Sequence, residues 1–332
     1  MILNKLFTSH MVFAANKPIR VFGTGAGHAV VTLAGERREV ISTTDSWMVE
    51  LPPKPCGGPF SMEVILDNTR TVLEDIYIGE VYLFGGQSNI EFTLKETNTP
   101  EHEYQSEDAL RFYTADRLGW DLHFSPADGW QVAEQASVGE WSALGYLAGR
   151  EIARKKGVAV GIVGCYQGGS IIETWMPEGA LAQVGIVVPA DQKHSDHHCD
   201  WAKNWNRDGL LYHHAFLPLT PFSFSGVVWY QGESDTTVAE AEVYDRELCT
   251  LIDIWRRDLK SDTLPFVVVQ IADLLPYRSE AWPMLQAAQQ RVPDMRPAVV
   301  MVRSADVCET DNIHPPTKTV LASRIAAALL QL

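Results

Sequence analysis

Hydrophobic and polar residues follow two different patterns along the chain, and the change comes near residue 76. Before it, short runs of alternating apolar and polar residues, such as 61–66, are separated by patches rich in glycine and proline, such as 23–27 and 57–59. A period of two residues is typical of strands with one buried face, and Gly and Pro favour turns between them. We therefore predict a small N-terminal β-sandwich domain over residues 1–75.

From residue 76 onward the pattern changes to buried strands that alternate with helices. Short apolar runs predict strands at 81–84, 158–163, 226–230, 266–271 and 298–302. Apolar residues at helical spacing predict a helix through Trp141, Leu144, Gly145, Ala148 and Ile152, and further helices at 238–259, 282–291 and 317–332. This alternation favours an α/β domain over residues 76–332, with a mainly parallel sheet and helices on both faces. The segment 98–139 has no clear period, and we predict irregular structure there.

Composition excludes several classes of partner. The 332 residues are 46% hydrophobic, which is enough for a large core, and the net charge of -15 argues against a nucleic-acid partner. No apolar run approaches the roughly 20 residues that a membrane helix needs. The first 20 residues lack a clean signal peptide, so we expect a cytoplasmic protein. The five cysteines are scattered without metal-ligand spacing, which fits reduced thiols.

The most informative stretch follows the apolar run 81–84, where two glycines lead to Ser88. Open α/β folds expose nucleophiles on turns of this kind, at the carboxyl end of a strand. Near the C-terminus, Asp311 and His314 form an Asp-x-x-His pattern. A serine early in the chain and this pair late in it suggest a hydrolase that works through an acyl-serine.

Each of these residues fits a step of acyl transfer. Ser88 would attack the ester carbonyl, His314 would act as general base and acid, and Asp311 would orient the imidazole. The tetrahedral oxyanion needs preorganised donors. The backbone N–H groups of Ser88 and Gly169 and the side-chain amide of Gln231 are the candidates, because each follows a predicted strand.

Several ordered blocks resemble one known family. The segments 86–89 (Gly-Gln-Ser-Asn), 229–234 (Trp-Tyr-Gln-Gly-Glu-Ser) and 311–315 (Asp-Asn-Ile-His-Pro) are similar to signature blocks of the sialate O-acetylesterase-like branch of the SGNH hydrolases. The segment 168–175 is similar to the second block, and the resemblance covers nearly the whole chain. It implies a flavodoxin-like catalytic domain that removes O-acetyl groups from sugars without a cofactor or metal.

The resemblance also implies the roles of single residues. Ser88, Asp311 and His314 would be the catalytic triad, and Ser88, Gly169 and Gln231 would form the oxyanion hole. The third block departs from the pattern of many SGNH enzymes, because Gln231-Gly232-Glu233 stands where they carry a Gly-x-Asn sequence.

The substrate implied by the resemblance is a small acetylated sugar, with sialic acid as the named candidate. Acetylated xylo- or manno-oligosaccharides are a second candidate, and a sugar-binding protein with an inactive site is a third. The sequence leaves the oligomeric state open. The candidate substrate-binding residues follow predicted strands, and they are Gln87, Asn89, Glu233, Trp175 and Arg303. Of these, Arg303 would be the cation that binds a carboxylated sugar.

Two further groups of residues have more than one interpretation. The cluster 194–200 contains three histidines, but its spacing matches no standard zinc pattern, so we predict a solvated loop near the substrate entrance. Trp175, Trp201 and Trp205 lie near strand ends, where stacking on a sugar and packing in the core are both open.

Overall fold

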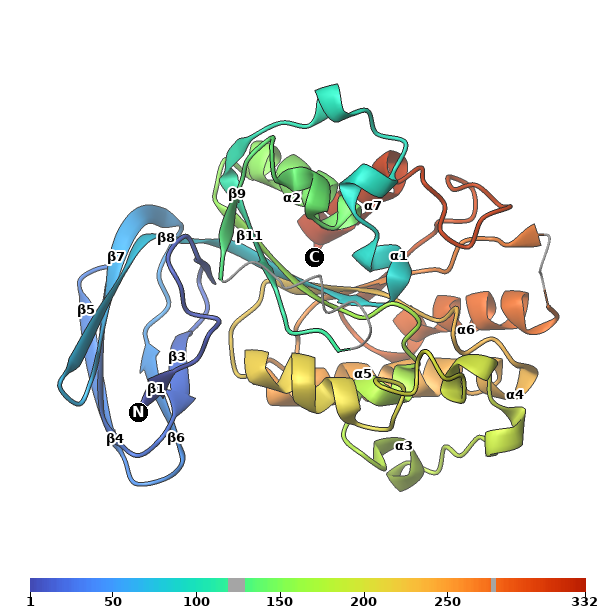
Figure 1. The fold of residues 1–332 in the computed structure, drawn as a ribbon, viewed down its shortest axis with the longest axis horizontal. Coiled ribbons are helices and arrows are strands. Elements are labelled where there is room, and N and C mark those ends of the chain that lie inside the picture. Colours follow the sequence, from blue (N-terminus) through green and yellow to red (C-terminus); the bar gives the residue numbers. More distant parts are fainter. Residues whose placement is uncertain (119–128, 276–278) are drawn as a thin grey trace.

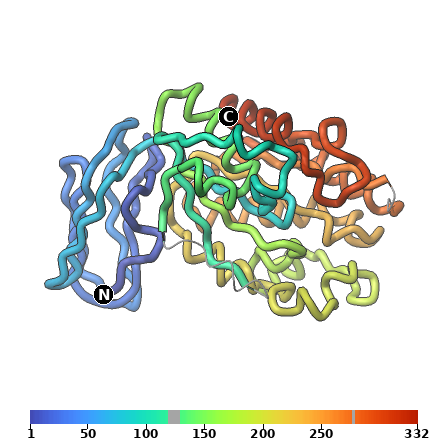
Figure 2. Tube along the Cα trace, turned by 45° about the horizontal axis from the view of Figure 1, so that its top comes forward, coloured from blue at the N-terminus to red at the C-terminus, as the bar shows by residue number. Residues whose placement is uncertain are grey.

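The computed structural model describes residues 1–118, 129–275 and 279–332. A large, mostly parallel sheet lies between two groups of helices, and a smaller all-β part sits at one end of it (Figure 1). Figure 2 shows the N-terminal strands at that end and the C-terminal helix along the larger part. In the ranges described, no helix is both long enough and apolar enough to cross a bilayer.

The five predicted strands form the centre of the large sheet, and all of them run parallel. Their spatial order is β11 (Val160–Tyr166), β8 (Thr69–Gly86), β12 (Gly226–Tyr230), β13 (Phe266–Val269) and β14 (Val299–Val302). In chain order this is 2-1-3-4-5, the order of flavodoxin-like folds. The order reverses at β8, and such a reversal leaves a crevice at the carboxyl ends of the strands.

The prediction of irregular structure over 98–139 is wrong in part, because two strands lie within the described residues of this segment; its residues 119–128 lie outside them. β9 (Glu107–Thr114) pairs in parallel with β11, and β10 (Gln131–Ala133) pairs antiparallel with β9 at the edge. The apolar pattern of β9 is interrupted by Arg111, which is nevertheless buried. Its guanidinium lies 3.2 Å from the Asp75 carboxylate and 4.4 Å from the centre of the Tyr77 ring. Partners distant in the sequence thus allow a charge inside this strand.

Helices cover both faces of the large sheet (Figure 1). On one face, α2 (Ala143–Lys156) packs against α7 (Thr319–Gln331); on the other, α5 (Tyr244–Asp258) packs against α6 (Ala281–Met295). The shorter helices are α1 (Ser88–Glu91), α3 (Ala180–Gln183) and α4 (Val238–Ala241). The start of α2 is fixed by the Ser142 hydroxyl, which accepts the Gly145 N–H at 3.1 Å.

The N-terminal part consists of two small sheets. One contains β1 (Ile2–Leu3), β3 (Ile19–Thr24) and β6 (Ser46–Leu51). The other contains β2 (Val12–Ala14), β4 (Gly27–Leu33), β5 (Glu36–Ser42), β7 (Gly57–Leu66) and the first half of β8. The predicted boundary at residue 75 therefore falls inside β8, a strand of 18 residues that continues into the centre of the large sheet.

Candidate active site

Ser88 lies directly after β8, at the start of α1. The turn depends on Gly86, whose φ of +135° is rare for residues with a side chain. A Cβ atom on Gly86 would lie 2.0 Å from the carbonyl oxygen of Tyr230 in the neighbouring strand β12. Only glycine fits at this point, and the turn that it allows places Ser88 at the edge of a cavity.

His314 reaches Ser88 from the far end of the chain. Its Nε2 atom lies 2.8 Å from Ser88 Oγ, a hydrogen-bonding distance suited to a nucleophile and its base. The Phe92 ring stacks on the imidazole with centroids 5.9 Å apart, and the His314 backbone N–H donates to Asn312 Oδ1 at 2.9 Å. The structure thus brings together two of the three predicted catalytic side chains.

Asp311, the third predicted member, borders the same cavity but is exposed to solvent. Within the described ranges, no hydrogen bond or ion pair joins its carboxylate to His314. The loop is held instead by Asn312 and by the Ile313 carbonyl, which accepts a hydrogen bond from Asn89 Nδ2 at 2.9 Å. The predicted orienting contact is therefore missing, and the imidazole is held by its backbone and by Phe92.

The surroundings of His314 favour the neutral imidazole that a general base requires. Burial lowers the pKa of His314, and the positive charge of Lys318 lowers it further, while Glu96 acts in the opposite direction. A lowered pKa keeps the ring unprotonated to lower pH, so Nε2 can accept the Ser88 hydroxyl proton.

Two of the three predicted oxyanion donors, the backbone N–H groups of Ser88 and Gly169, belong to residues that border the cavity. Gly169 has φ +64°, and Asn206 Nδ2 donates to its carbonyl oxygen at 2.7 Å. Asn206 Oδ1 also accepts the Ile171 N–H at 3.1 Å, so one buried amide fixes this loop. Across the described residues, the backbone N–H groups of Ser88 and Gly169 have no protein acceptor. They remain available to a bound oxyanion.

Gln231, the predicted third donor, lies in a different place from the one we predicted. Its side chain is fully buried, and Nε2 donates to the Ser170 carbonyl at 2.9 Å and to the Asp235 carboxylate. Its Oε1 accepts the Tyr244 hydroxyl at 2.7 Å. With both amide hydrogens engaged, Gln231 supports the loop that carries Gly169 and does not face the cavity.

The cavity beside Ser88 and His314 has a volume of about 920 Å³, within the range of small-ligand sites. Of the candidate substrate-binding residues, Gln87 and Glu233 line it, whereas Asn89, Trp175 and Arg303 do not. Trp175 is fully buried and donates to Ser170 Oγ at 2.9 Å, so it belongs to the core. Arg303 is exposed, and among the described residues the guanidinium that borders the cavity is that of Arg117, which pairs with Glu91.

Tryptophans line much of the cavity wall. Trp201 is 46% exposed and covers Gly169, and Trp205 is buried against it with ring centroids 5.8 Å apart. Trp282, at the start of α6, was missed because its helical pattern indicates only packing. Exposed aromatic faces suit the apolar faces of sugar rings.

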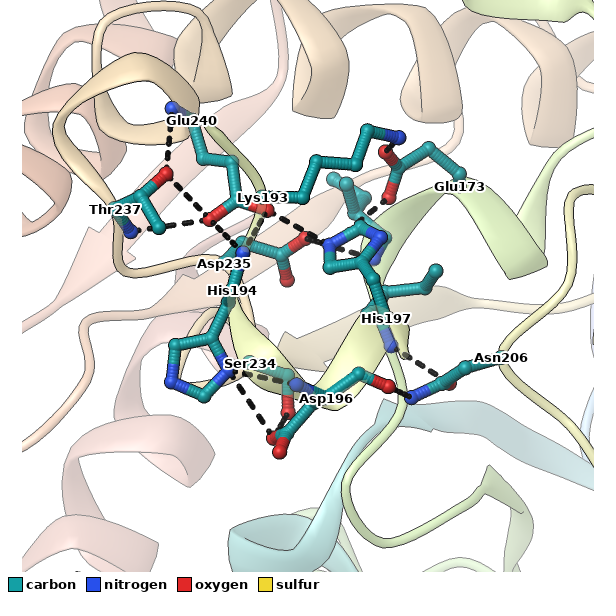
Figure 3. A network of polar contacts seen from close by, with 12 residues as sticks. Glu173, Lys193, His194, Asp196, His197, Asn206, Ser234, Asp235, Thr237 and Glu240 are labelled. Carbon is teal, nitrogen blue, oxygen red and sulfur yellow. Dashed lines mark hydrogen bonds and ion pairs between the residues drawn. The ribbon is translucent and has the colours of Figure 1, made fainter. Parts of the chain in front are cut away.

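The prediction of a solvated loop near the substrate entrance over 194–200 is right only in part. Ser195, His198 and Asp200 are exposed, and His194 and Asp196 border the cavity. The His197 side chain, however, is buried among carboxylates (Figure 3).

His197 Nε2 lies 2.7 Å from Glu240 Oε1, and Lys193 Nζ donates to Glu173 Oε1 at 2.7 Å. Burial opposes protonation, but hydrogen bonds to Asp235 and Glu240 raise the pKa of His197 to about 10. The protonated form of His197 is thus stabilised by Asp235 and Glu240, which are distant in the sequence and could not be predicted from the spacing within 194–200.

His197 and two of the carboxylates around it are the residues that could hold a metal ion. The ligand atoms of Glu173, His197 and Asp235 lie within 4.8 Å of one another. The protonated imidazole and the Lys193 ammonium already balance carboxylates here. Asp235 Oδ1 also accepts the Ile172 N–H at 3.3 Å, so the cluster supports the loop that carries Gly169.

Comparison with known proteins agrees with this geometry. Residues 78–331 match the model of the family described as carbohydrate esterase, sialic acid-specific acetylesterase. The chain belongs to this family. The resemblance seen in the sequence blocks is therefore confirmed.

Relatives of known name extend the comparison beyond the family model. The sialate O-acetylesterases of Pongo abelii and Homo sapiens are 27% and 26% identical over 92% of this chain, which spans 65% of their length. The crystal structure of a carbohydrate acetylesterase from Xanthomonas citri has a TM-score of 0.85 and 28% identity, covering 98% of this chain and 74% of that chain. The fold of the N-terminal part is thus shared as well.

The Gly169 loop gives a matched pair of glycine substitutions. Gly169 and Gly157 have nearly the same φ, +64° and +65°, but a Cβ atom at Gly169 would lie 2.4 Å from Trp201, and one at Gly157 would meet nothing. We expect each alanine variant to lose about 1 kcal/mol of unfolding free energy from its backbone. Gly169→Ala alone should also lose about 10²-fold in kcat/KM, through the displaced donor.

Urea unfolding and ester hydrolysis, measured on both variants, check this expectation. Equal kcat/KM values for Gly169→Ala and Gly157→Ala would show that the Gly169 N–H takes no part in the reaction.

The position of Asp311 leads to a second expectation. Because Asp311 does not contact His314, Asp311→Asn removes no interaction with the imidazole and should change kcat/KM by no more than roughly two- to threefold. If Asp311 oriented His314 as a triad aspartate does, the asparagine variant would lose about 10⁴-fold in kcat. Hydrolysis of an acetyl ester by Asp311→Asn and His314→Ala, side by side, separates these outcomes. A loss near that of His314→Ala would mean that Asp311 binds the imidazole during turnover.

Proposed function

We propose that the protein is a serine-dependent carbohydrate O-acetylesterase. The observation that carries the proposal is the 2.8 Å hydrogen bond between Ser88 Oγ and His314 Nε2 at the edge of a large cavity. Family membership and the names of the relatives support the same activity. A sugar-binding protein with an inactive site would not need a serine and a histidine held in this way.

The reaction follows from the positions of these groups. Ser88 Oγ attacks the acetyl carbonyl while His314 Nε2 takes its proton, and the oxyanion forms next to the N–H groups of Ser88 and Gly169. Collapse breaks the ester bond, and the sugar oxygen leaves with the proton from His314. Water then attacks acetyl-Ser88, again giving a proton to His314, and acetate departs as Ser88 is restored.

Sialic acid carrying an O-acetyl group is the first candidate substrate. The family description and the names of the relatives support it. Trp201, which is 46% exposed at the cavity wall, offers an aromatic face that fits the apolar side of a sugar ring.

An acetylated neutral sugar, such as a xylo- or manno-oligosaccharide, is the second candidate, and the charges around the cavity favour it. Asp196, Glu233 and Asp311 all border the cavity. In the ranges that the structure describes, Arg117 is the only lysine or arginine that borders it, and Glu91 pairs with its guanidinium. A neutral sugar avoids repulsion between its own charge and these carboxylates.

Acetate release from a panel of acetylated sialic acids, acetylated xylo- and manno-oligosaccharides and a small activated acetyl ester tests the proposal. Ser88→Ala should lose roughly 10⁴-fold or more of the wild-type rate on every active substrate. Ser46→Ala, an exposed serine in β6, is the control and should keep full activity.

The outcomes separate the alternatives. Retained turnover in folded Ser88→Ala would overturn the acyl-serine mechanism. Sugar binding by the wild type without any acetate release would favour the binding protein. Release from acetylated sialic acid that exceeds release from neutral sugars would identify the first substrate, and the opposite order would identify the second.

A further inference from the structure

Lys318 is a fully buried lysine just before α7, behind the His314 loop. Its ammonium group donates to Asn89 Oδ1 at 2.8 Å. The group also lies 5.2 Å from the centre of the Phe92 ring and 5.9 Å from that of Tyr230. Since Lys318 forms no ion pair with a carboxylate in the described ranges, an amide and two aromatic faces solvate its charge.

Asn89 connects this lysine to the residues around Ser88 and His314. Its Nδ2 donates to Glu233 Oε1 at 2.6 Å and to the Ile313 carbonyl at 2.9 Å. One buried side chain therefore joins the segment after β8, the segment after β12 and the residue before His314. Oδ1 can accept from Lys318 only while the amide keeps this orientation, so the lysine fixes which way Asn89 points.

The charges near His314 come from several elements, and they do not all act in one direction. Lys318 opposes protonation of the imidazole, whereas Glu96 favours it. The titratable groups that face Lys318 are Cys308, Glu233 and Glu309. Burial lowers the pKa of Lys318 to about 8, so the ammonium form predominates at neutral pH.

We propose that Lys318 is a positioning residue for the base: it holds the His314 loop through Asn89 and places a positive charge beside the Phe92 ring that stacks on the imidazole. Lys318 thereby fixes the His314 loop and favours the unprotonated imidazole. Asp311, from its exposed position, does neither. The inference rests on the proposed role of His314 as general base.

Two substitutions separate the two functions of the lysine. Lys318→Met removes both the charge and the donor, whereas Lys318→Gln removes the charge and keeps an N–H donor toward Asn89. Without the ammonium, His314 protonates more readily, so the acid limb of the kcat/KM profile should move to higher pH in both variants, by about 0.5–1 pH unit. At the pH plateau, kcat/KM of Lys318→Met should fall roughly tenfold or more, because the His314 loop is no longer held through Asn89. The fall for Lys318→Gln should be smaller.

An NMR titration of the His314 ring gives a readout that does not depend on turnover. The resonance is assigned by comparison with His314→Asn, and its midpoint should rise in both lysine variants. Lys155→Met, which removes an exposed lysine from α2, controls for net charge and should leave both the midpoint and the acid limb in place.

Loss of Lys318 leaves Glu233 buried without a compensating charge, and the single variants could unfold for that reason. The double variant Lys318→Met/Glu233→Gln restores neutrality and should fold while keeping the raised His314 midpoint. An unchanged midpoint and acid limb in the folded variants would overturn the proposal. That result is distinct from failure of the proposed function, which would appear as acetate release by Ser88→Ala.

Discussion

The candidate active site depends on one contact, the hydrogen bond between Ser88 and His314, whose partners are 226 residues apart in the chain. Neither side chain could be held there by local structure alone. Ser88 is placed by the end of the central strand and by a glycine that no other residue could replace. His314 lies on a loop without regular secondary structure, and the loop is fixed because Asn89 binds the carbonyl of the preceding residue. The buried side chains of Asn89 and Lys318 keep these two segments together.

A second layer of buried polar contacts serves the other side of the site. Asn206, Gln231 and Asp235 all bond to the loop that carries Gly169, and His197 and its carboxylates support Asp235 in turn. A buried polar group that loses its partner is costly, so such a network favours one loop conformation. Preorganised backbone donors need this rigidity, since reorientation during the reaction would weaken them.

The sequence predicted those features that depend on local pattern. All five strands of the sheet centre and the main helices follow from apolar periodicity, and the Ser88 turn follows from its glycines. β9 was missed because Arg111 interrupts its pattern, and the partners that make this charge acceptable, Asp75 and Tyr77, are distant in the sequence. The family blocks indicated His314 correctly as a neighbour of Ser88. They could not indicate that Gln231 donates its amide hydrogens to Ser170 and Asp235, or that Lys318 is buried behind the His314 loop, because those contacts depend on packing.

Covalent labelling tests the central claim most directly. A serine-reactive fluorophosphonate is added to the wild type and to His314→Ala, and peptide mass spectrometry locates the adduct. If Ser88 is the nucleophile and His314 activates it, the wild type carries the adduct on Ser88, and His314→Ala reacts far more slowly at the same residue. Loss of esterase activity with the adduct on another residue, or full activity in a protein labelled on Ser88, would contradict this account.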